Sequence, residues 1–229
     1  MAEPVNVLLM LSGGPDSATL AGYVARELAA GKPPHAIYPR SGHPADKKES
    51  EAAKQIAGRI GSWLEIVDIP ALLHTLQSDR LMTPSENSIV PFGTAIALSL
   101  IMLCAIRAQA STIYVGYHRD DAEENEGYAR PAMDRLEYLA AIDRNVAPKI
   151  IAPFLAMTKT EVFKLGAAIS VPYDLTWSCL RAGDLHCGQC SACRARRRAF
   201  TGAGLVDPMR YEETTAPSSV RAGRSIDLL

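Results

Sequence analysis

The chain has 229 residues, 48% of them apolar, which is enough to bury one sizeable core with a small satellite module. A formal net charge of −1 provides no overall field for a nucleic-acid backbone, so such a partner would require a local basic patch. The opening residues, MAEPVNVLLMLSGG, lack a basic leader, and their apolar run is far shorter than a membrane span of roughly 20 residues. These features predict a cytoplasmic protein that contains no membrane span.

Strand-like and helix-like segments alternate along the chain. Short apolar or β-branched runs predict strands over residues 5–11, 35–38, 63–69, 112–116 and 149–152. Helical spacing predicts helices over residues 16–30, 45–61, 89–110, 131–142 and 158–170. This alternation predicts an α/β fold, a Rossmann-like parallel sheet sandwiched by helices, with ligands beyond the carboxyl ends of the strands.

Composition also suggests how the chain is divided. We expect a nucleotide-binding α/β domain over 1–175, a metal-binding segment over 176–211 that packs on it, and a tail over 212–229. The tail is polar and irregular, which is typical of a flexible end or of an arm that contacts another subunit.

A glycine-rich turn joins the first expected strand to the first expected helix. Ser12, Gly13, Gly14, Asp16 and Ser17 lie there, where backbone N–H groups and the helix dipole attract an anion. The glycines allow close approach of a phosphate, the serines offer hydroxyl groups, and Asp16 suits Mg²⁺ or a helix cap. The alternative is a capped turn that binds nothing. A Walker-type lysine is absent from this turn, which argues against cleavage at the γ-phosphate.

The motif Ser-Gly-Gly-Pro-Asp-Ser over 12–17 resembles that of the PP-loop ATP pyrophosphatases. The resemblance implies that ATP is cleaved between its α- and β-phosphates and that AMP is transferred to a substrate oxygen. It also implies that Lys159 binds phosphate, although a lysine in the first turn of a helix can simply be exposed. Catalysis is expected from Ser12, Asp16, Ser17 and Lys159. The expected ATP-binding residues are Leu11, Ser12, Gly13, Gly14, Asp16, Ser17, Tyr38, Arg40 and Lys159, with Tyr38 and Arg40 acting through their main chain.

Four of the five cysteines are grouped near the C-terminus. Cys179, Cys187, Cys190 and Cys193 follow the pattern C-x7-C-G-x-C-x-x-C, which suits a closed tetrahedral Zn²⁺ site. The alternatives are an iron–sulfur cluster, because the last three recur at every third residue, and four free thiols. Cys104 lies in an apolar helical run and is expected in the core, so no activated thiol is in view for sulfur transfer.

A narrower resemblance rests on Thr-Trp-Ser-Cys at 176–179, Cys-Gly-Gln-Cys-Ser-Ala-Cys at 187–193, Ala-Pro-Phe at 152–154 and Thr-Lys-Thr-Glu at 158–161. These motifs resemble the 7-cyano-7-deazaguanine synthase family, which contributes to queuosine-type bases. The resemblance implies an adenine nucleotide alpha hydrolase-like fold and a carbon–nitrogen ligase that uses ATP, Mg²⁺, ammonia and zinc. It implies that 7-carboxy-7-deazaguanine is converted to an amide and then a nitrile, and that the enzyme is a homodimer.

Two segments depart from that family. Residues 90–94 read Val-Pro-Phe-Gly-Thr where the family has Val-Pro-x-Arg-Asn, and residues 128–130 read Tyr-Ala-Arg where it has Asp-Cys-Arg. Both are expected to line the substrate side of the pocket. The alternative is therefore an enzyme with a more open pocket that joins the activated acid to a larger amine, such as a protein N-terminus. Arg130 is a candidate anchor for a substrate carboxylate, and the alternative is a surface arginine that begins a helix.

Three further features have both a functional and a structural interpretation. His118 could act as acid or base toward ammonia, or be structural. Asp120 and Asp121 could bind a second Mg²⁺, or form a solvated loop. The arginines over 194–198 could contact tRNA, as in a tRNA-modifying PP-loop enzyme, but we favour ion pairs beside the thiolates, so nucleic acid is not the expected partner. A metal-stabilised binding module without catalysis is the remaining alternative.

Overall fold

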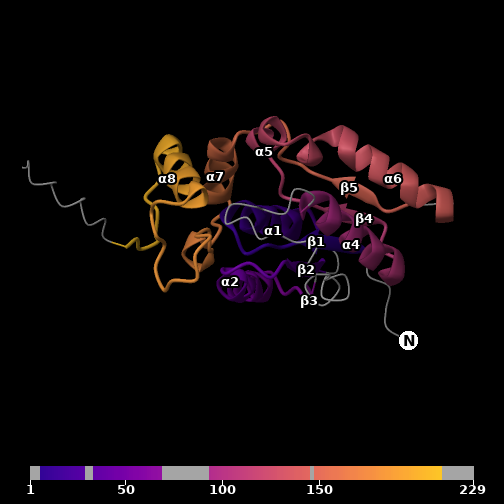
Figure 1. Cartoon of the computed structure of the whole chain (residues 1–229), viewed down its shortest axis with the longest axis horizontal. Helices are drawn as coiled ribbons and strands as arrows, with labels where there is room; N and C mark the ends of the chain where they lie inside the picture. Colours follow the sequence, from indigo (N-terminus) through magenta and orange to yellow (C-terminus); the bar gives the residue numbers. More distant parts are fainter. Residues whose placement is uncertain (1–5, 29–32, 69–92, 145–146, 213–229) are drawn as a thin grey trace, which may run out of the picture.

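The computed structural model describes residues 6–28, 33–68, 93–144 and 147–212 (Figure 1). Its strands are β1 (Val7–Met10), β2 (His35–Arg40), β3 (Leu64–Asp68), β4 (Thr112–Tyr114) and β5 (Lys149–Ile151). Its helices are α1 (Pro15–Glu27), α2 (Asp46–Arg59), α4 (Gly93–Ala108), α5 (Arg119–Glu124), α6 (Arg130–Arg144), α7 (Lys159–Ala168) and α8 (Ser191–Ala203). Short 3-10 turns lie at η1 (Glu126–Tyr128) and η2 (Tyr173–Leu175). Predicted element ends at residues 5, 29–30, 69 and 89–92, and the tail from residue 213, lie outside the described residues.

The five strands form one parallel sheet in the order β3-β2-β1-β4-β5. β1 lies at the centre, with Leu9 opposite Ala36 of β2 on one side and Tyr114 of β4 on the other. The order reverses direction at β1, so its carboxyl end lies at a topological switch point, where open α/β sheets bind ligands. The predicted α/β fold with a parallel sheet is confirmed.

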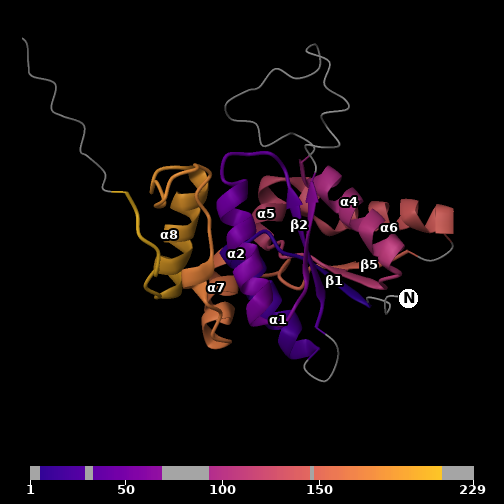
Figure 2. The same cartoon turned by 90° about the horizontal axis from the view of Figure 1, so that it is seen from below.

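Helices cover both faces of the sheet, as expected for parallel strands joined by crossovers (Figure 2). Successive residues of β1 face opposite sides: Leu9 joins a core with α1, α2, α7 and α8, whereas Leu8 joins a core with α4 and α6. α7 and α8 extend the first layer, since α7 packs against both α1 and α8. None of the described helices is both long and apolar enough to cross a lipid bilayer.

An aromatic cluster joins the layer of α1 to the C-terminal helices. The Phe163 and Tyr173 rings stack with centroids 5.3 Å apart, and the Phe200 ring meets each of them edge-on. The Tyr173 hydroxyl donates to the main-chain oxygen of Phe163 and lies 2.9 Å from Thr19 Oγ1. The hydroxyl group therefore has little freedom to move within this cluster.

We expect Gly166→Ala to lower the free energy of unfolding by about 1–3 kcal/mol, because a methyl group there overpacks the cluster. A Cβ on Gly166 would lie 1.9 Å from the Tyr173 hydroxyl oxygen and 2.6 Å from Thr19 Oγ1. Urea denaturation measures the change. The matched control is Gly58→Ala in α2, where nothing lies within 4 Å of the new Cβ, and it should be neutral or stabilising. Equal stability of the two variants would contradict the expectation.

Candidate active site

The loop after β1 has the geometry of an anion site. Gly14 is the N-cap of α1, Pro15 opens the helix, and Asp16 lies in its first turn. The Ser12 and Ser17 hydroxyl oxygens are 3.1 Å apart, and Ser17 donates to the main-chain oxygen of Gly14. Ser12, Gly13, Gly14, Asp16 and Ser17 are therefore brought together around the N-terminus of a buried helix, where backbone N–H groups favour a phosphate.

Gly13 is the position in this loop that tolerates no side chain. Its φ of +80° is a left-handed conformation, and a Cβ there would lie 2.2 Å from the main-chain oxygen of Glu49 in α2. Leu11, which precedes the loop, is fully buried and donates its N–H to Ile37 of β2 at 2.9 Å. The loop is thus pinned between its neighbouring strand and the first turns of α2.

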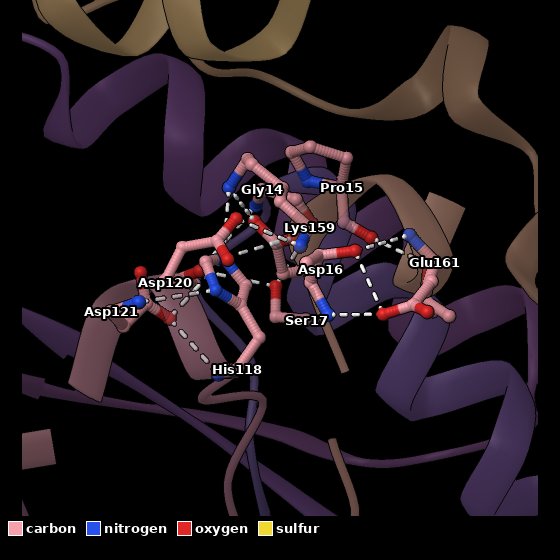
Figure 3. A network of polar contacts seen from close by, with 12 residues as sticks. Gly14, Pro15, Asp16, Ser17, His118, Asp120, Asp121, Lys159 and Glu161 are labelled. Carbon is pink, nitrogen blue, oxygen red and sulfur yellow. Dashed lines mark hydrogen bonds and ion pairs between the residues drawn. The ribbon is translucent and has the colours of Figure 1, made fainter. Parts of the chain in front are cut away.

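Lys159 reaches this loop from the far end of the chain. Its Nζ lies 2.5 Å from Asp16 Oδ2, and both side chains are mostly buried (Figure 3). Thr158 and Glu161 form a capping box that begins α7 and so fixes where Lys159 points. The pair joins residues that are 143 positions apart in sequence. Lys159 is therefore not a freely exposed lysine in this structure.

His118 lies beside that pair at the end of β4. It is 2% exposed, and its Nε2 lies 3.7 Å from Asp16 Oδ1 and 3.3 Å from Lys159 Nζ (Figure 3). Its Nδ1 accepts the N–H of Asp121 at 3.2 Å, so a neutral ring carries its proton on Nε2, the nitrogen that faces the site. His118 is the N-cap of α5, which makes it structural and places it in the site at once.

The two acidic residues after His118 have different partners. Asp120 accepts the main-chain N–H of Lys159 at 3.0 Å and so ties α5 to α7. Asp121 closes the capping box with His118, and Asp121 Oδ2 lies 3.3 Å from His118 Nε2. Burial raises the pKa of the Asp121 carboxyl, with a further contribution from the Asp16 carboxylate, although His118 and Lys159 oppose the shift. The acidic stretch is a short capped helix and not a loop, although Asp120 is exposed there.

The cysteine segment has the geometry of a closed metal site. The sulfur atoms of Cys179, Cys187, Cys190 and Cys193 all lie within 4.8 Å of one another, and the Cys187 and Cys193 sulfurs are 3.9 Å apart. A tetrahedral Zn²⁺ with bonds of about 2.3 Å places its sulfurs about 3.8 Å apart. Backbone N–H groups of Arg181 and Cys187 point at the Cys179 sulfur, as thiolate ligands require.

The same N–H pattern favours a thiolate at Cys187. Burial acts to raise the pKa of the Cys187 thiol, but N–H donors from Gln189 and Cys190 outweigh it and lower the pKa to about 7. Burial raises the pKa of the Cys193 thiol. Because a metal binds thiolates, its charge would have to overcome the cost of ionising Cys193.

Residues 6–204 match the family described as Queuosine biosynthesis protein QueC. The chain belongs to the QueC family. A 7-cyano-7-deazaguanine synthase from Methanothrix thermoacetophila is 34% identical over 229 residues, covering 90% of this chain and 99% of that protein. Another from Methanoculleus marisnigri is 32% identical and covers 90% of this chain and 99% of its own length.

Solved structures with lower sequence identity to this chain have the same fold. A structure of NMN synthetase from Francisella tularensis superposes with a TM-score of 0.53 at 20% identity, covering 88% of this chain and 84% of that one. An NH3-dependent NAD synthetase from Campylobacter jejuni gives a TM-score of 0.52 at 19% identity, covering 76% of this chain and 68% of that one. These likenesses support the adenine nucleotide alpha hydrolase-like fold.

Other expected site residues of this QueC member lie around the loop or apart from it. Tyr38 is buried, and its hydroxyl donates to Asp46 Oδ1 at 2.7 Å, so any contact with a ligand would be through its main chain. Arg40 ends β2 in an ion pair with Asp68. Arg130 lies apart: its guanidinium donates to Asp134, to Glu137 and to the main-chain oxygen of Ile150. It would have to leave these partners to hold a substrate carboxylate.

The four arginines over 194–198 differ in burial: Arg196 is buried, and the other three are exposed. Arg196 is fully buried, its Nε lies 3.0 Å from Asp207 Oδ2, and its Nη1 donates to the Thr176 hydroxyl. Arg194 donates to the main-chain oxygen of Gln189, and the Arg197 guanidinium lies over the Tyr211 ring. The contacts of Arg196 agree with the preferred structural interpretation.

Two participants have contacts that were not predicted from the sequence. Asp121, considered with Asp120 as a Mg²⁺ ligand, faces His118 and the site. Trp177 donates its main-chain N–H to the Gly13 oxygen at 2.9 Å and so contacts the phosphate loop directly. The sequence feature that could have indicated a role for Trp177 is its position two residues before Cys179, the first cysteine of the cluster.

Proposed function

We propose that this chain is an ATP-dependent 7-cyano-7-deazaguanine synthase. It adenylates 7-carboxy-7-deazaguanine and converts the acid to an amide and then to a nitrile, with ammonia as nitrogen donor. The observation that carries the proposal is a phosphate loop whose Asp16 meets Lys159, in a chain that aligns over 90% of its length with relatives named as this synthase.

In this proposal the loop holds the β- and γ-phosphates of ATP. Backbone N–H groups at the start of α1, together with the Ser12 and Ser17 hydroxyls, donate to phosphate oxygens. Lys159 stabilises the charge that accumulates on pyrophosphate as the bond to the α-phosphorus breaks. The main chain at Leu11, Tyr38 and Arg40 borders the adenine side.

Adenylation solves the chemical problem posed by the substrate. A carboxylate is a poor electrophile because its charge is delocalised, whereas its mixed anhydride with AMP has a good leaving group. The substrate carboxylate attacks the α-phosphorus, pyrophosphate departs, and ammonia then displaces AMP to form the amide. The amide oxygen then attacks the α-phosphorus of a second ATP, and pyrophosphate departs. Loss of AMP, which carries away the amide oxygen, and of the protons on nitrogen leaves the nitrile. Positioning the two reactants supplies much of the rate enhancement.

Asp16 is the residue that suits Mg²⁺. Its Oδ1 is buried and accepts no hydrogen bond from the described residues, while Oδ2 faces Lys159. A hard cation prefers such a carboxylate oxygen, so the residues fit the group. When bound there with ATP, Mg²⁺ would neutralise phosphate charge. Asp120 is not available in the same way, because its carboxylate holds the N–H of Lys159.

His118 is proposed to orient Asp16 and Lys159, which lie next to its Nε2. Because its Nδ1 accepts the N–H of Asp121, the neutral ring carries its proton on Nε2 and does not take a proton from ammonium. Asp120 is proposed to hold the start of α7, and Arg130 stays a candidate for the substrate carboxylate only if it exchanges its present partners. The metal of Cys179, Cys187, Cys190 and Cys193 is proposed to be zinc in a structural site over the 176–211 segment, because all four positions of a tetrahedron are filled by protein.

A homodimer is proposed as the active unit. α6 presents three largely exposed apolar side chains, Tyr138, Leu139 and Ile142, which is more than a surface helix needs. Self-association through such a face would bury them. Light scattering coupled to size-exclusion chromatography measures the mass directly.

The function is tested by product analysis. Zinc-loaded protein is incubated with ATP, Mg²⁺, ammonium and 7-carboxy-7-deazaguanine, and AMP, amide and nitrile are followed together by mass spectrometry. We expect AMP, transient amide and nitrile. Amide or adenylate without nitrile would replace the proposal by ligation to a larger amine, such as a protein N-terminus. Absence of AMP with this acid would overturn the substrate assignment, and tRNA or another acid would be tried next.

A further inference from the structure

Trp177 connects the cysteine segment to the phosphate loop. Its main-chain N–H donates to the Gly13 oxygen at 2.9 Å. On the next residue of the loop, a Cβ placed on Gly14 would lie 3.7 Å from the Trp177 oxygen, so the two backbones run in contact. Trp177 donates to the carbonyl of Gly13, the one residue of this loop with a left-handed φ. A small movement of Trp177 would therefore release Gly13, the loop residue that tolerates no side chain.

The other side of Trp177 is bound to the cysteine segment. Its indole Nε1 donates to the main-chain oxygen of Cys179 at 2.8 Å, and its ring lies 4.3 Å from the His186 ring. His186 precedes Cys187, and its Nε2 accepts the N–H of Ser178 at 3.1 Å. The 7% exposed indole is buried in a cluster that also contains Cys179, Cys187 and Cys193.

α2 completes the enclosure of the loop from the same cluster. Ala45 and Ala52 pack with Trp177 and the cysteines, and Lys48 Nζ lies 5.5 Å above the indole ring. The main-chain oxygen of Glu49, between them, is the atom that a side chain on Gly13 would meet. Gly13 is thus fixed by α2 and Trp177 together, and both contact the cysteine segment.

The cysteine segment has little regular structure. Residues 176–190 contain no helix or extended strand, and their order comes from sulfur contacts, an isolated bridge between His186 and Tyr211, side-chain contacts and Arg196. A metal held by these four cysteines would cross-link Cys179 to Cys193 of α8, and removal of the metal would break this cross-link. We infer that the metal segment holds the phosphate loop in its ATP-binding conformation through Trp177, so that ATP affinity depends on the metal. The nucleotide part of this inference rests on the proposed function.

The first test needs no nucleotide. Hydrogen–deuterium exchange is measured over residues 11–17 in metal-loaded protein, in chelator-treated protein and in metal-loaded Trp177→Ala. We expect faster exchange of this peptide in both altered states, with exchange of β4 and α4 peptides unchanged. Metal-loaded Trp177→Ala with wild-type exchange over 11–17 would overturn the inference, whatever chelation does to the rest of the fold. Trp177→Phe keeps a ring beside His186 but loses the Nε1 donor to Cys179, so its exchange over 11–17 should lie between those of wild type and Trp177→Ala.

The second test measures the ATP dissociation constant in the same proteins by titration calorimetry. Chelation should weaken ATP binding to the wild-type protein by about tenfold, the change in affinity expected when a contact that orders the loop is lost. It should weaken Trp177→Ala binding by less than about twofold, because the connection is already cut and the effects are not additive. Equal ATP affinity with and without metal, or strictly additive losses, would contradict the inference. No ATP binding in any state would instead sink the proposed function, while the exchange experiment would still decide the coupling.

Discussion

We expect Asp16→Asn to lower AMP formation by a factor on the order of 10²–10³, with the fold and the metal content unchanged. The amide has the shape of the carboxylate but none of its charge, so Lys159 would lose its partner and the proposed Mg²⁺ would lose an oxygen ligand. Because Asp16 lies in the first turn of α1, an amide can still be accommodated there. Pyrophosphate release under saturating ATP and Mg²⁺ measures the loss, and circular dichroism monitors the fold.

The matched control is Asp184→Asn. Asp184 also pairs with a lysine, since Lys48 Nζ lies 2.9 Å from its Oδ1, but its side chain is almost fully exposed. An exposed ion pair contributes little, so this variant should keep wild-type activity and stability. If Asp16→Asn were as active as Asp184→Asn, the assignment of Asp16 to the reaction would be wrong.

Arg196→Met destabilises the folded protein by about 3–5 kcal/mol, because it leaves a buried carboxylate without its cation. Arg196 is fully buried, and the Asp207 side chain is only 12% exposed. The arginine also donates to the Thr176 and Ser178 hydroxyls and to the main-chain oxygen of Tyr173, all of which lose a donor. Urea denaturation of the metal-loaded protein gives the change in the free energy of unfolding.

Arg198→Met is the comparison for that experiment. It makes the same substitution on the same helix, at an exposed position, and should change the free energy of unfolding by less than about 0.5 kcal/mol. A similar small effect for Arg196→Met would show that the buried pair is energetically neutral. The result would also remove the structural reason for the arginine cluster and revive RNA as its partner.

The order of strands and helices followed from the sequence because each unit has its own apolar run and its own turn. β2 begins at His35 and β5 at Lys149, the residues at which strands were predicted to start. The phosphate loop was recognisable for the same reason: its function depends on six adjacent residues. Such local signals survive without knowledge of the tertiary structure.

Pairings between distant residues could not be obtained in this way. The resemblance suggested Lys159, but not that its ammonium meets Asp16 or that its N–H is held by Asp120. The charge of a single residue also does not show which partner it has. Arg130 was a candidate for a substrate carboxylate, and its guanidinium donates to Glu137 and Asp134 of its own helix. In the run Arg-Ala-Arg-Arg-Arg, only helix packing distinguishes the buried Arg196 from its exposed neighbour Arg198.

The 143 positions between Asp16 and Lys159 have a consequence for the order of events during synthesis. The first βα unit emerges early, yet it lacks the lysine until β5 and α7 have been made and docked. A nucleotide therefore cannot stabilise the early intermediates in the way that it stabilises the finished protein. A complete binding loop would therefore mark a chain in which α7 has already been translated and docked, because its two halves come from β1–α1 and from α7.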